Sequence, residues 1–356
     1  MPCYYLVFVL SVSVLVGAVP RKWNDTGVGS VIIEEAYSLP QLTELPPSGG
    51  DPPLGQTTAQ LHANLADIHT QRLASMDATG VDFMVLSCAS PCLQGISDPV
   101  LADSLMTSVN DETASLISNN SMRFGAFAAL SMHNASAAAE ELRRTVDGYG
   151  FLGALVNDYQ QSGSDNATLL YYDQPEYDVF WDAVQELDVP IYFHPRIPVA
   201  QVTALDYAHA PWLLGAPHQF AVELSSHVAG LCTNGVFDRF PKLKIIVGHL
   251  GERIPSDLWR IDDGLSRKLA SGIPMKKPFS SYWKTNIWET TSGNFATDLL
   301  HFHTSILGPE RILYSVDYPF VTMQQGAEWV DSLRWSEGEK LGFVRGNAIR
   351  LLGLDR

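Results

Sequence analysis

Short apolar segments alternate with longer amphipathic segments along most of the chain. Eight of the short segments are rich in β-branched and aromatic residues, which is typical of strands. They are VIIEEA (31–36), DFMVLSCA (82–89), FGAFAAL (124–130), GALVND (153–158), PIYFHP (190–195), KIIVGHLGE (244–252), IWETTSG (287–293) and ILYSVDYPF (312–320). Between them lie segments of helical periodicity such as ASAAAEELRRTVDGYG and DVFWDAVQELDV. This alternation predicts an α/β fold, a (β/α)8 TIM barrel, as a single domain over residues 30–356.

Polar residues gather at the carboxyl ends of these strands, where a barrel of this type builds its active site. Glu34 and Glu35 end the first strand, Asn157 and Asp158 the fourth, His194 the fifth, His249 the sixth and Asp317 the eighth. A strand that only surfaces into solvent would also end in acids. Carboxylates and imidazoles that face one centre, however, suit a divalent cation. The set therefore favours a metal site at the mouth, with Glu35 turned away from Glu34 because side chains alternate along a strand.

Charge and composition restrict the partners. The chain of 356 residues is 46% hydrophobic, enough for a sizeable core, and its net charge is −16 with no basic run to offset it. This charge argues against nucleic acids and anionic membrane surfaces. An anionic substrate would need a local cation or a metal.

The N-terminus carries an apolar run, YYLVFVLSVSVLVGAV, in which Val16-Gly17-Ala18 fits a small-residue cleavage site. We predict a signal peptide over residues 1–18 and a secreted, extracellular protein. An uncleaved membrane anchor is the alternative, because no Lys or Arg precedes the run whereas Arg21 and Lys22 follow it. Glycosylation sequons agree with the secretory pathway and lie at Asn24, Asn119, Asn134 and Asn166.

Cysteine is sparse beyond the leader, where it occurs at Cys88, Cys92 and Cys232. This is neither a disulfide scaffold nor a recognisable metal–thiolate spacing. In an oxidising compartment Cys88 and Cys92, in CASPC, would close a small disulfide loop. Two unpaired thiols in a loop are the alternative.

A series of motifs resembles, in order and spacing, the metal-dependent amidohydrolase-related decarboxylases. The motifs are EEAYSLP, FGAFAALSMHN, GALVND, FHP, TNGVFDRFPKLKIIVGHLGE, WRID, TTSGNF and YSVDYPF, within residues 30–356. They look most similar to fungal 2,3-dihydroxybenzoate and salicylate decarboxylases, with γ-resorcylate decarboxylase a near relative. The resemblance implies one divalent ion (Zn²⁺, Mn²⁺ or Mg²⁺), a small aromatic carboxylic acid as substrate, and a homodimer or homotetramer.

The resemblance also implies roles for individual residues. Glu34, His194 and Asp317 match the metal ligands, and Asp317 also matches a proton-transfer relay with His249 and Glu252. His249 and Glu252 are three residues apart, so a helical turn beginning there would let the carboxylate orient the imidazole.

Arg260, in WRID, matches the substrate-contacting arginine of the family, and Asn157 is a further expected substrate contact. His227 also matches a family position, but we expect a buried structural role. Two segments depart from the family: QLTELPPSGGDPPLG (41–55) lacks aromatic residues, and CASPC replaces a stretch that usually carries one. We therefore expect the family's metal site with a rebuilt substrate pocket.

The resemblance implies a carbon–carbon lyase that decarboxylates an ortho-hydroxybenzoate to the phenol and CO2 without oxidation. A hydrolase of a lactone, amide or ester is one alternative, since the same barrel and metal can activate water. A secreted binding protein without catalysis is another, against which the intact Glu34, His194, His249 and Asp317 argue. The sequence leaves open the ring substitution of the substrate, the native metal and the oligomeric state.

Overall fold

A computed structural model describes residues 21–42, 51–165 and 168–355. The predicted signal peptide and the sequon residue Asn166 lie outside this range. Within the part of the chain that is described, no helix combines the length and apolar character that crossing a membrane requires.

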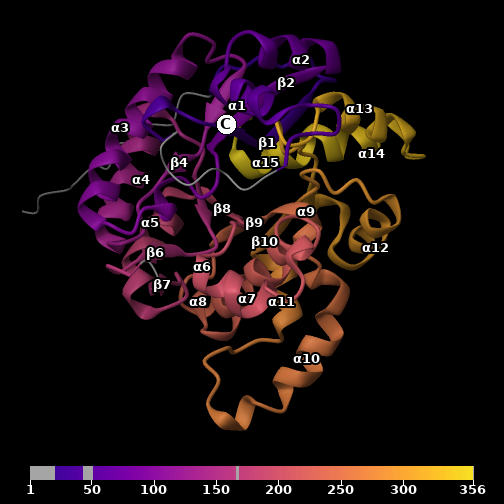
Figure 1. The fold of residues 1–356 in the computed structure, drawn as a ribbon. Coiled ribbons are helices and arrows are strands. Elements are labelled where there is room, and N and C mark those ends of the chain that lie inside the picture. The colour runs from indigo at the N-terminus through magenta and orange to yellow at the C-terminus, as the bar shows by residue number, and fades with distance from the viewer. Residues whose placement is uncertain (1–20, 43–50, 166–167, 356) are drawn as a thin grey trace, which may run out of the picture.

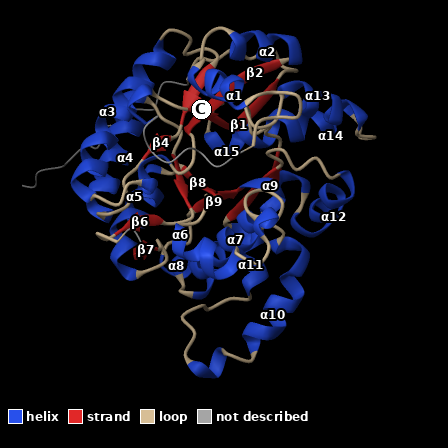
Figure 2. Ribbon diagram, in the orientation of Figure 1, coloured by secondary structure: helices blue, strands red, loops and turns tan. Residues whose placement is uncertain are grey.

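Parallel strands form the centre of the molecule and helices surround them (Figure 1, Figure 2). The strands are β1 (Ser30–Tyr37), β2 (Val81–Cys88), β3 (Phe124–Ala126), β4 (Ala128–Ala129), β5 (Ala154–Asn157), β8 (Pro190–His194), β9 (Lys244–Val247), β10 (Ile287–Thr290) and β11 (Ile312–Leu313). They pair in the order β1-β2-β3 and, in a second sheet, β11-β10-β9-β8-β5-β4. Each predicted strand is present, and β3 with β4 is one strand broken at Phe127.

Backbone hydrogen bonds join the two sheets into a barrel. At the break, Phe127 N donates to Leu86 O of β2 at 2.9 Å. On the other side, Asp317 N donates to Glu34 O at 3.1 Å, beyond the end of β11. The predicted (β/α)8 barrel is therefore confirmed.

The helices follow the strands as the alternating pattern predicts. They are α1 (Thr58–Ala66), α2 (Gln71–Thr79), α3 (Pro99–Ser118), α4 (Ala135–Tyr149), α5 (Asp178–Leu187), α6 (Ala200–Val202), α7 (Gln219–Thr233), α8 (Val236–Arg239), α9 (Gly248–Gly251), α10 (Leu258–Ser266), α11 (Phe279–Thr285), α12 (Thr297–Leu307), α13 (Met323–Ser332), α14 (Glu337–Leu341) and α15 (Asn347–Leu352). A short antiparallel hairpin, β6 (Gln160–Ser162) with β7 (Thr168–Leu170), was not predicted.

Capping residues explain several of these boundaries. Asp98 accepts hydrogen bonds from the N–H groups in the first turn of α3. Pro99 occupies the first helical position, where the missing N–H of proline costs nothing because no helix has a hydrogen-bond acceptor for it there. The helix α4 ends at Gly150, whose φ of 68° is left-handed and therefore favours glycine. Local chemistry thus sets where these helices begin and end.

Buried apolar residues form an inner and an outer layer. The inner cluster includes Val31, Ile33, Phe83, Tyr192 and Ile246 from the strands, and α15 packs against it through Ala348 and Leu351. The outer cluster includes the alternate strand residues, such as Ile32 and Met84, with the surrounding helices. Because the inside of the barrel is filled by side chains, ligands are confined to its mouth.

Candidate metal centre

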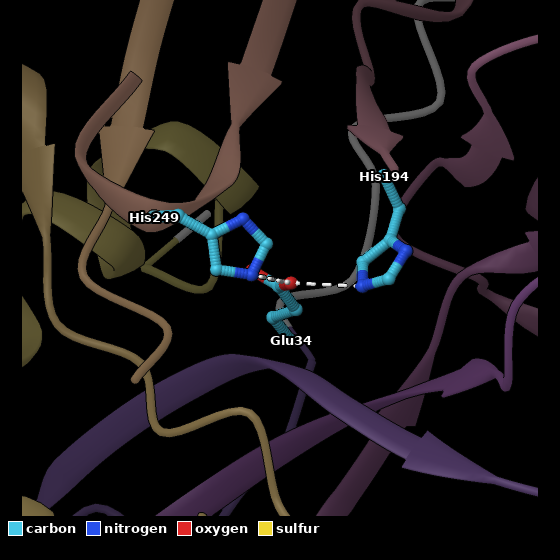
Figure 3. A group of neighbouring side chains, drawn as sticks. All are labelled: Glu34, His194 and His249. Carbon is cyan, nitrogen blue, oxygen red and sulfur yellow. Dashed lines mark ion pairs between the residues drawn. The ribbon is translucent and has the colours of Figure 1, made fainter. Parts of the chain in front are cut away.

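Three side chains from different strands converge at the carboxyl ends of the barrel strands. Glu34 comes from β1, His194 from β8, and His249 directly follows β9 (Figure 3). Glu34 Oε1 lies 3.2 Å from His194 Nε2 and 3.5 Å from His249 Nε2. One potential ligand atom from each residue lies within 4.8 Å of the others. This is the geometry expected of protein groups that share one ion.

Hydrogen bonds on the far side of each ring determine which nitrogen faces this centre. His194 Nδ1 lies 2.6 Å from the carbonyl oxygen of Pro195, and His249 Nδ1 lies 2.6 Å from Glu252 Oε1. Both partners accept, so both Nδ1 atoms carry a proton, and each ring turns its Nε2 atom towards Glu34. Glu34 Oε1 is buried and accepts no hydrogen bond from the described residues.

When both rings are neutral, their Nε2 lone pairs and the Glu34 carboxylate oxygen point at one centre, and a cation there removes the repulsion between them. One carboxylate and two imidazoles are donors that Zn²⁺ and Mn²⁺ accept readily. The second shell is also of the usual kind, since ligating imidazoles almost always donate their other N–H to a carbonyl or a carboxylate. The residues present therefore fit a divalent metal ion.

The pKa values of Glu34, His249 and Asp317 are shifted by burial and by the charges of their neighbours. Burial raises the pKa of Glu34, but the neighbouring His249 and His194 outweigh this effect and hold the pKa below its ordinary value. Burial lowers the pKa of His249, but the carboxylates of Glu252 and Glu34 outweigh it and raise the pKa to about 10. Burial and the charge of Glu34 raise the pKa of Asp317 well above its ordinary value.

A bulge in β1 directs the two adjacent acids to different places. The pairing of β1 with β2 shifts register between Ile32 and Glu35. The N–H groups of Ile33 and Glu34 both donate to Ser315 Oγ, each at 2.8 Å. Bulges of this kind re-aim side chains next to active sites. Here Glu34 faces the mouth, and Glu35 accepts hydrogen bonds from the backbone beyond β11, which matches the supporting role predicted for it.

Close approach of β9 to Glu34 requires a glycine. A Cβ atom on Gly248 would lie 2.9 Å from both Glu34 Oε2 and the Tyr192 hydroxyl oxygen. Thr290 Oγ1 donates to Glu34 Oε2 at 3.2 Å and lies 2.6 Å from the Tyr192 hydroxyl. Thr290 thus holds one carboxylate oxygen of Glu34, Oε2, and leaves Oε1 for the centre.

His249 and Glu252 are in contact, but the turn that joins them is left-handed. The φ angles are 54° at His249 and 57° at Leu250, and Glu252 has a φ of 47°. Asn294 Nδ2 donates to His249 O at 3.0 Å and helps to hold this conformation. The predicted helical turn is therefore replaced by a strained one, and the expected imidazole–carboxylate contact is preserved.

Asp317 lies beside the three converging residues rather than among them. Its backbone has a φ of 72°, and its side chain lines the same cavity as His194 and His249. The structure thus gathers His249 with Glu34 and His194. The role of Asp317 as a ligand stays a prediction from the resemblance.

A cavity of about 370 Å³ opens in front of these residues. Apolar side chains from three separate segments, Leu214, Phe220, Phe320 and Val321 among them, provide part of its wall. The polar lining includes Asp51, Ser90, Arg253, Asn294 and Asp317. Among the described lining residues Arg253 is the only Lys or Arg. The cavity can therefore hold a flat apolar ring with oxygen substituents.

Several of the predicted residues lie outside this cavity. Asn157 is buried behind the wall, because its Nδ2 donates to Pro91 O at 3.0 Å and to Gln94 Oε1 at 2.6 Å. Arg260 is exposed on α10, and its role as a substrate contact stays a prediction. His227 is buried and accepts a hydrogen bond from Tyr172 N at 2.9 Å, as expected of a structural histidine.

Other residues of the cavity were not predicted. Arg253, Asn294 and Phe320 directly follow or end strand-end motifs that the sequence had marked, so their positions gave a usable signal. Phe220, on α7, had none. Cys88 and Cys92 are joined by a disulfide, which decides between the two readings of CASPC.

Comparisons with known proteins give a consistent result. Residues 59–354 match the family model described as amidohydrolase. The chain is 41% identical to a γ-resorcylate decarboxylase of Rhizobium sp., over 92% of this chain and 99% of that protein. The crystal structure of a 2,6-dihydroxybenzoate decarboxylase from Rhizobium has a TM-score of 0.85 and 40% identity, and covers 92% of this chain and 99% of its own.

A second solved structure bears on the metal. It is a dihydroxybenzoic acid decarboxylase from Polaromonas sp. with bound manganese and the inhibitor 2-nitroresorcinol, and it has a TM-score of 0.85 and 36% identity. The alignment covers 92% of this chain and 98% of that one. Each of these alignments thus covers most of this chain and nearly all of the related one.

Proposed function

The chain belongs to the amidohydrolase family, among its metal-dependent aromatic-acid decarboxylases, and we propose that it is a carboxy-lyase acting on 2,6-dihydroxybenzoate and related ortho-hydroxybenzoates. The products would be the phenol and CO2, with no net oxidation. The observation that carries the proposal is the convergence of Glu34, His194 and His249 at the mouth of a barrel shared with such decarboxylases.

Residue roles follow from geometry and resemblance together. The geometry gathers Glu34, His194 and His249, and the resemblance gives Glu34, His194 and Asp317 as metal ligands. We assign Glu34 and His194, on which the two agree, and follow the resemblance in taking Asp317 as the third ligand and His249 as a proton-transfer group. A divalent ion held there would act as a Lewis acid towards the carboxylate and the adjacent phenolic oxygen. Manganese is the first candidate, because a related decarboxylase binds it. His249 is assigned to proton transfer, since Glu252 fixes its tautomer and keeps Nε2 turned to the mouth.

The reaction needs one proton at the ring carbon that bears the carboxylate. Asp317 and His249 line the same cavity and are the groups we assign to deliver it. When that carbon has gained the proton, the electron pair of the C–C bond returns to the ring and CO2 leaves. The apolar wall, including Phe220 and Phe320, would hold the ring face and exclude water, and Arg253 would hydrogen-bond an oxygen substituent.

A product assay tests this function directly. Purified protein reconstituted with Mn²⁺ is incubated with 2,6-dihydroxybenzoate, 2,3-dihydroxybenzoate and 2-hydroxybenzoate, and the phenols are separated by chromatography. 4-Hydroxybenzoate, which has no hydroxyl beside the carboxylate, is the matched control and should remain intact. In D2O the product should carry deuterium where the carboxylate was. Absence of any phenol, with hydrolysis of a lactone or ester panel instead, would establish the hydrolase.

We also propose that the chain enters the secretory pathway and is secreted after loss of residues 1–18. The Cys88–Cys92 bridge supports this, because disulfides persist in oxidising compartments. The sequon residues Asn119 and Asn134 are exposed. Asn134 caps α4 through Oδ1, which leaves Nδ2 as the atom that a glycan would modify.

Mass spectrometry of protein from a eukaryotic secretory host tests the compartment. We expect an N-terminus at Val19 and glycans at one or more sequons. An intact Met1 together with glycans would indicate the membrane-anchored form. An intact Met1 with unmodified asparagines would contradict the secretory proposal.

We propose, finally, a homodimer or homotetramer. Trp212 and Trp259 are 90% and 79% exposed, which is unusual for tryptophan and typical of a contact surface. Light scattering coupled to size-exclusion chromatography would give the mass. A monomer at all concentrations would contradict this proposal.

A further inference from the structure

The loop after β2 is closed covalently beside the metal centre. Cys88 is the last residue of β2 and is bridged to Cys92, at the start of a short 3-10 helix (Cys92–Gly95). Ser90 lies between them and lines the cavity together with His194. The loop thus carries a hydroxyl group to the edge of the site.

The hydroxyl group of Ser90 is hydrogen-bonded to the carbonyl group that orients His194. Ser90 Oγ donates to the carbonyl oxygen of Pro195 at 2.9 Å. The same carbonyl oxygen lies 2.6 Å from Nδ1 of His194, whose proton it accepts. A carbonyl oxygen has two lone pairs, so it accepts both hydrogen bonds at once. The orientation of the His194 ring therefore depends on a peptide group that Ser90 holds.

Further contacts attach the loop to the same wall of the barrel. Pro91 O and Gln94 Oε1 both accept from Asn157 Nδ2 at the end of β5, at 3.0 and 2.6 Å. Gln94 O accepts from the guanidinium of Arg196 at 2.8 Å, just beyond β8. These bonds hold the far end of the loop, and the disulfide ties that end back to β2. Ser90 is thereby kept against Pro195.

We propose that Ser90 and the Cys88–Cys92 bridge form one positioning device for His194, so that the affinity of the site for its metal depends on the bridge being closed. This rests on the metal site of the proposed function and adds a property of this chain's own loop. Neither Ser90 nor the cysteines need touch the ion. They act by fixing the acceptor of the His194 Nδ1 proton.

The first experiment removes the hydroxyl. Metal-free protein is titrated with Mn²⁺ alone, by calorimetry, without substrate. Ser90→Ala should raise the dissociation constant about 10-fold, the lower end of the range for partners of metal-ligating histidines. Ser90→Thr keeps the hydroxyl and should restore the affinity. Ser108→Ala is the matched control, because its Oγ donates to Leu105 O at 3.0 Å on an exposed face of α3, and it should change nothing.

The second experiment opens the loop. The double variant Cys88→Ser with Cys92→Ser should also bind Mn²⁺ about 10-fold more weakly. Adding Ser90→Ala to it should cost little more, because the two changes act through one carbonyl and are not additive. A phosphine reductant, oxidised to its oxide as the disulfide takes up two electrons and two protons, should weaken binding by the wild type but not by the double variant.

The outcomes separate this inference from the proposed function. If the wild type binds Mn²⁺ and decarboxylates, but Ser90→Ala and the open loop bind Mn²⁺ equally well, the positioning role is refuted, whatever happens to the thermal midpoint. Full additivity of the two changes would refute their action as one device. Mn²⁺ binding without decarboxylation would refute the function alone. A wild type that binds no divalent ion would overturn both.

Discussion

Two adjacent acids of β1 should respond in opposite ways to the same substitution. Glu35 is buried, and its Oε1 accepts from Ser315 Oγ and Val316 N, both at 3.0 Å, while its Oε2 accepts from Tyr318 N at 2.8 Å. Glu34 Oε1 accepts no hydrogen bond from any residue that the structure describes. Glutamine has nearly the same size as glutamate, so the exchange tests charge and hydrogen bonding rather than packing.

The cost of Glu35→Gln follows from the count of acceptors. The single amide oxygen can keep the two bonds of Oε1, but the amide NH2 then faces the N–H of Tyr318, and two donors meet. A buried donor left without a partner costs about 1–3 kcal/mol, and the lost bond was to a charged acceptor. We expect the free energy of unfolding to fall by about 2–4 kcal/mol. The metal affinity should change much less.

Glu34→Gln should show the reverse. It removes a carboxylate ligand, so Mn²⁺ affinity should fall about 100-fold or more. The metal-free protein should lose less stability than with Glu35→Gln, because only the attraction of His249 and His194 that lowers the pKa of Glu34 is removed. Burial raises the pKa of Glu35 to about 7, so at about pH 8 this carboxyl is ionised and accepts all three hydrogen bonds. Burial of its charge offsets part of their contribution there, so the loss for Glu35→Gln at about pH 8 should lie at the lower end of the expected range.

Urea unfolding followed by tryptophan fluorescence gives the stabilities, and calorimetric titration of metal-free protein gives the affinities. A Glu35→Gln protein that unfolds at the wild-type urea concentration would refute the hydrogen-bond argument. A Glu34→Gln protein that binds Mn²⁺ like the wild type would refute the metal assignment.

Three further predictions concern the proton relay, the substrate and pH. His249→Asn should lower kcat about 100-fold with Mn²⁺ affinity retained; loss of that affinity would instead make His249 a ligand. Arg253→Gln should raise KM for 2,6-dihydroxybenzoate while kcat changes little, because Arg253 is the lone cationic Lys or Arg among the described cavity residues; an unchanged KM in initial-rate assays would exclude the contact. Burial and the charge of Asp158 raise the pKa of Glu223 to about 7, above its value in the unfolded chain, so its contribution to stability is full at low pH and is lost as pH rises through 7. Between about pH 5 and about pH 8, the free energy of unfolding should therefore fall less for Glu223→Gln than for the wild type, as measured by urea unfolding. An equal fall in both proteins would contradict this.

The strands could be predicted from the sequence because buried strands appear in it as continuous apolar runs. The residues at which the strands begin and end could not be predicted in this way. Within the segment KIIVGHLGE, β9 stops at Val247, and His249 and Leu250 adopt left-handed conformations that no local pattern indicates. The hairpin of β6 and β7 was missed because QQS and TLL show neither an apolar run nor a clear alternation.

The strand-end rule found most of the site for a physical reason. Strand ends share one face of a barrel, so chemistry-bearing residues there are neighbours whatever their separation in sequence. The rule says nothing of residues that reach the mouth from loops and helices. Leu214 and Phe220 arrive in this way, and their places depend on packing between distant segments.

The direction of the Glu34 side chain could not be predicted from the alternation of residues along β1. Val31 and Ile33 pack inside the barrel, so strict alternation would turn Glu34 outwards and Glu35 inwards. The bulge reverses this order, and it is held by Ser315 Oγ, which accepts from the N–H groups of both Ile33 and Glu34. Ser315 lies in the last strand unit, almost the whole chain away, and becomes a neighbour only when the barrel closes. Closure of the fold is thus what aims the carboxylate at the metal centre, and the same closing contacts through Glu35 keep it there.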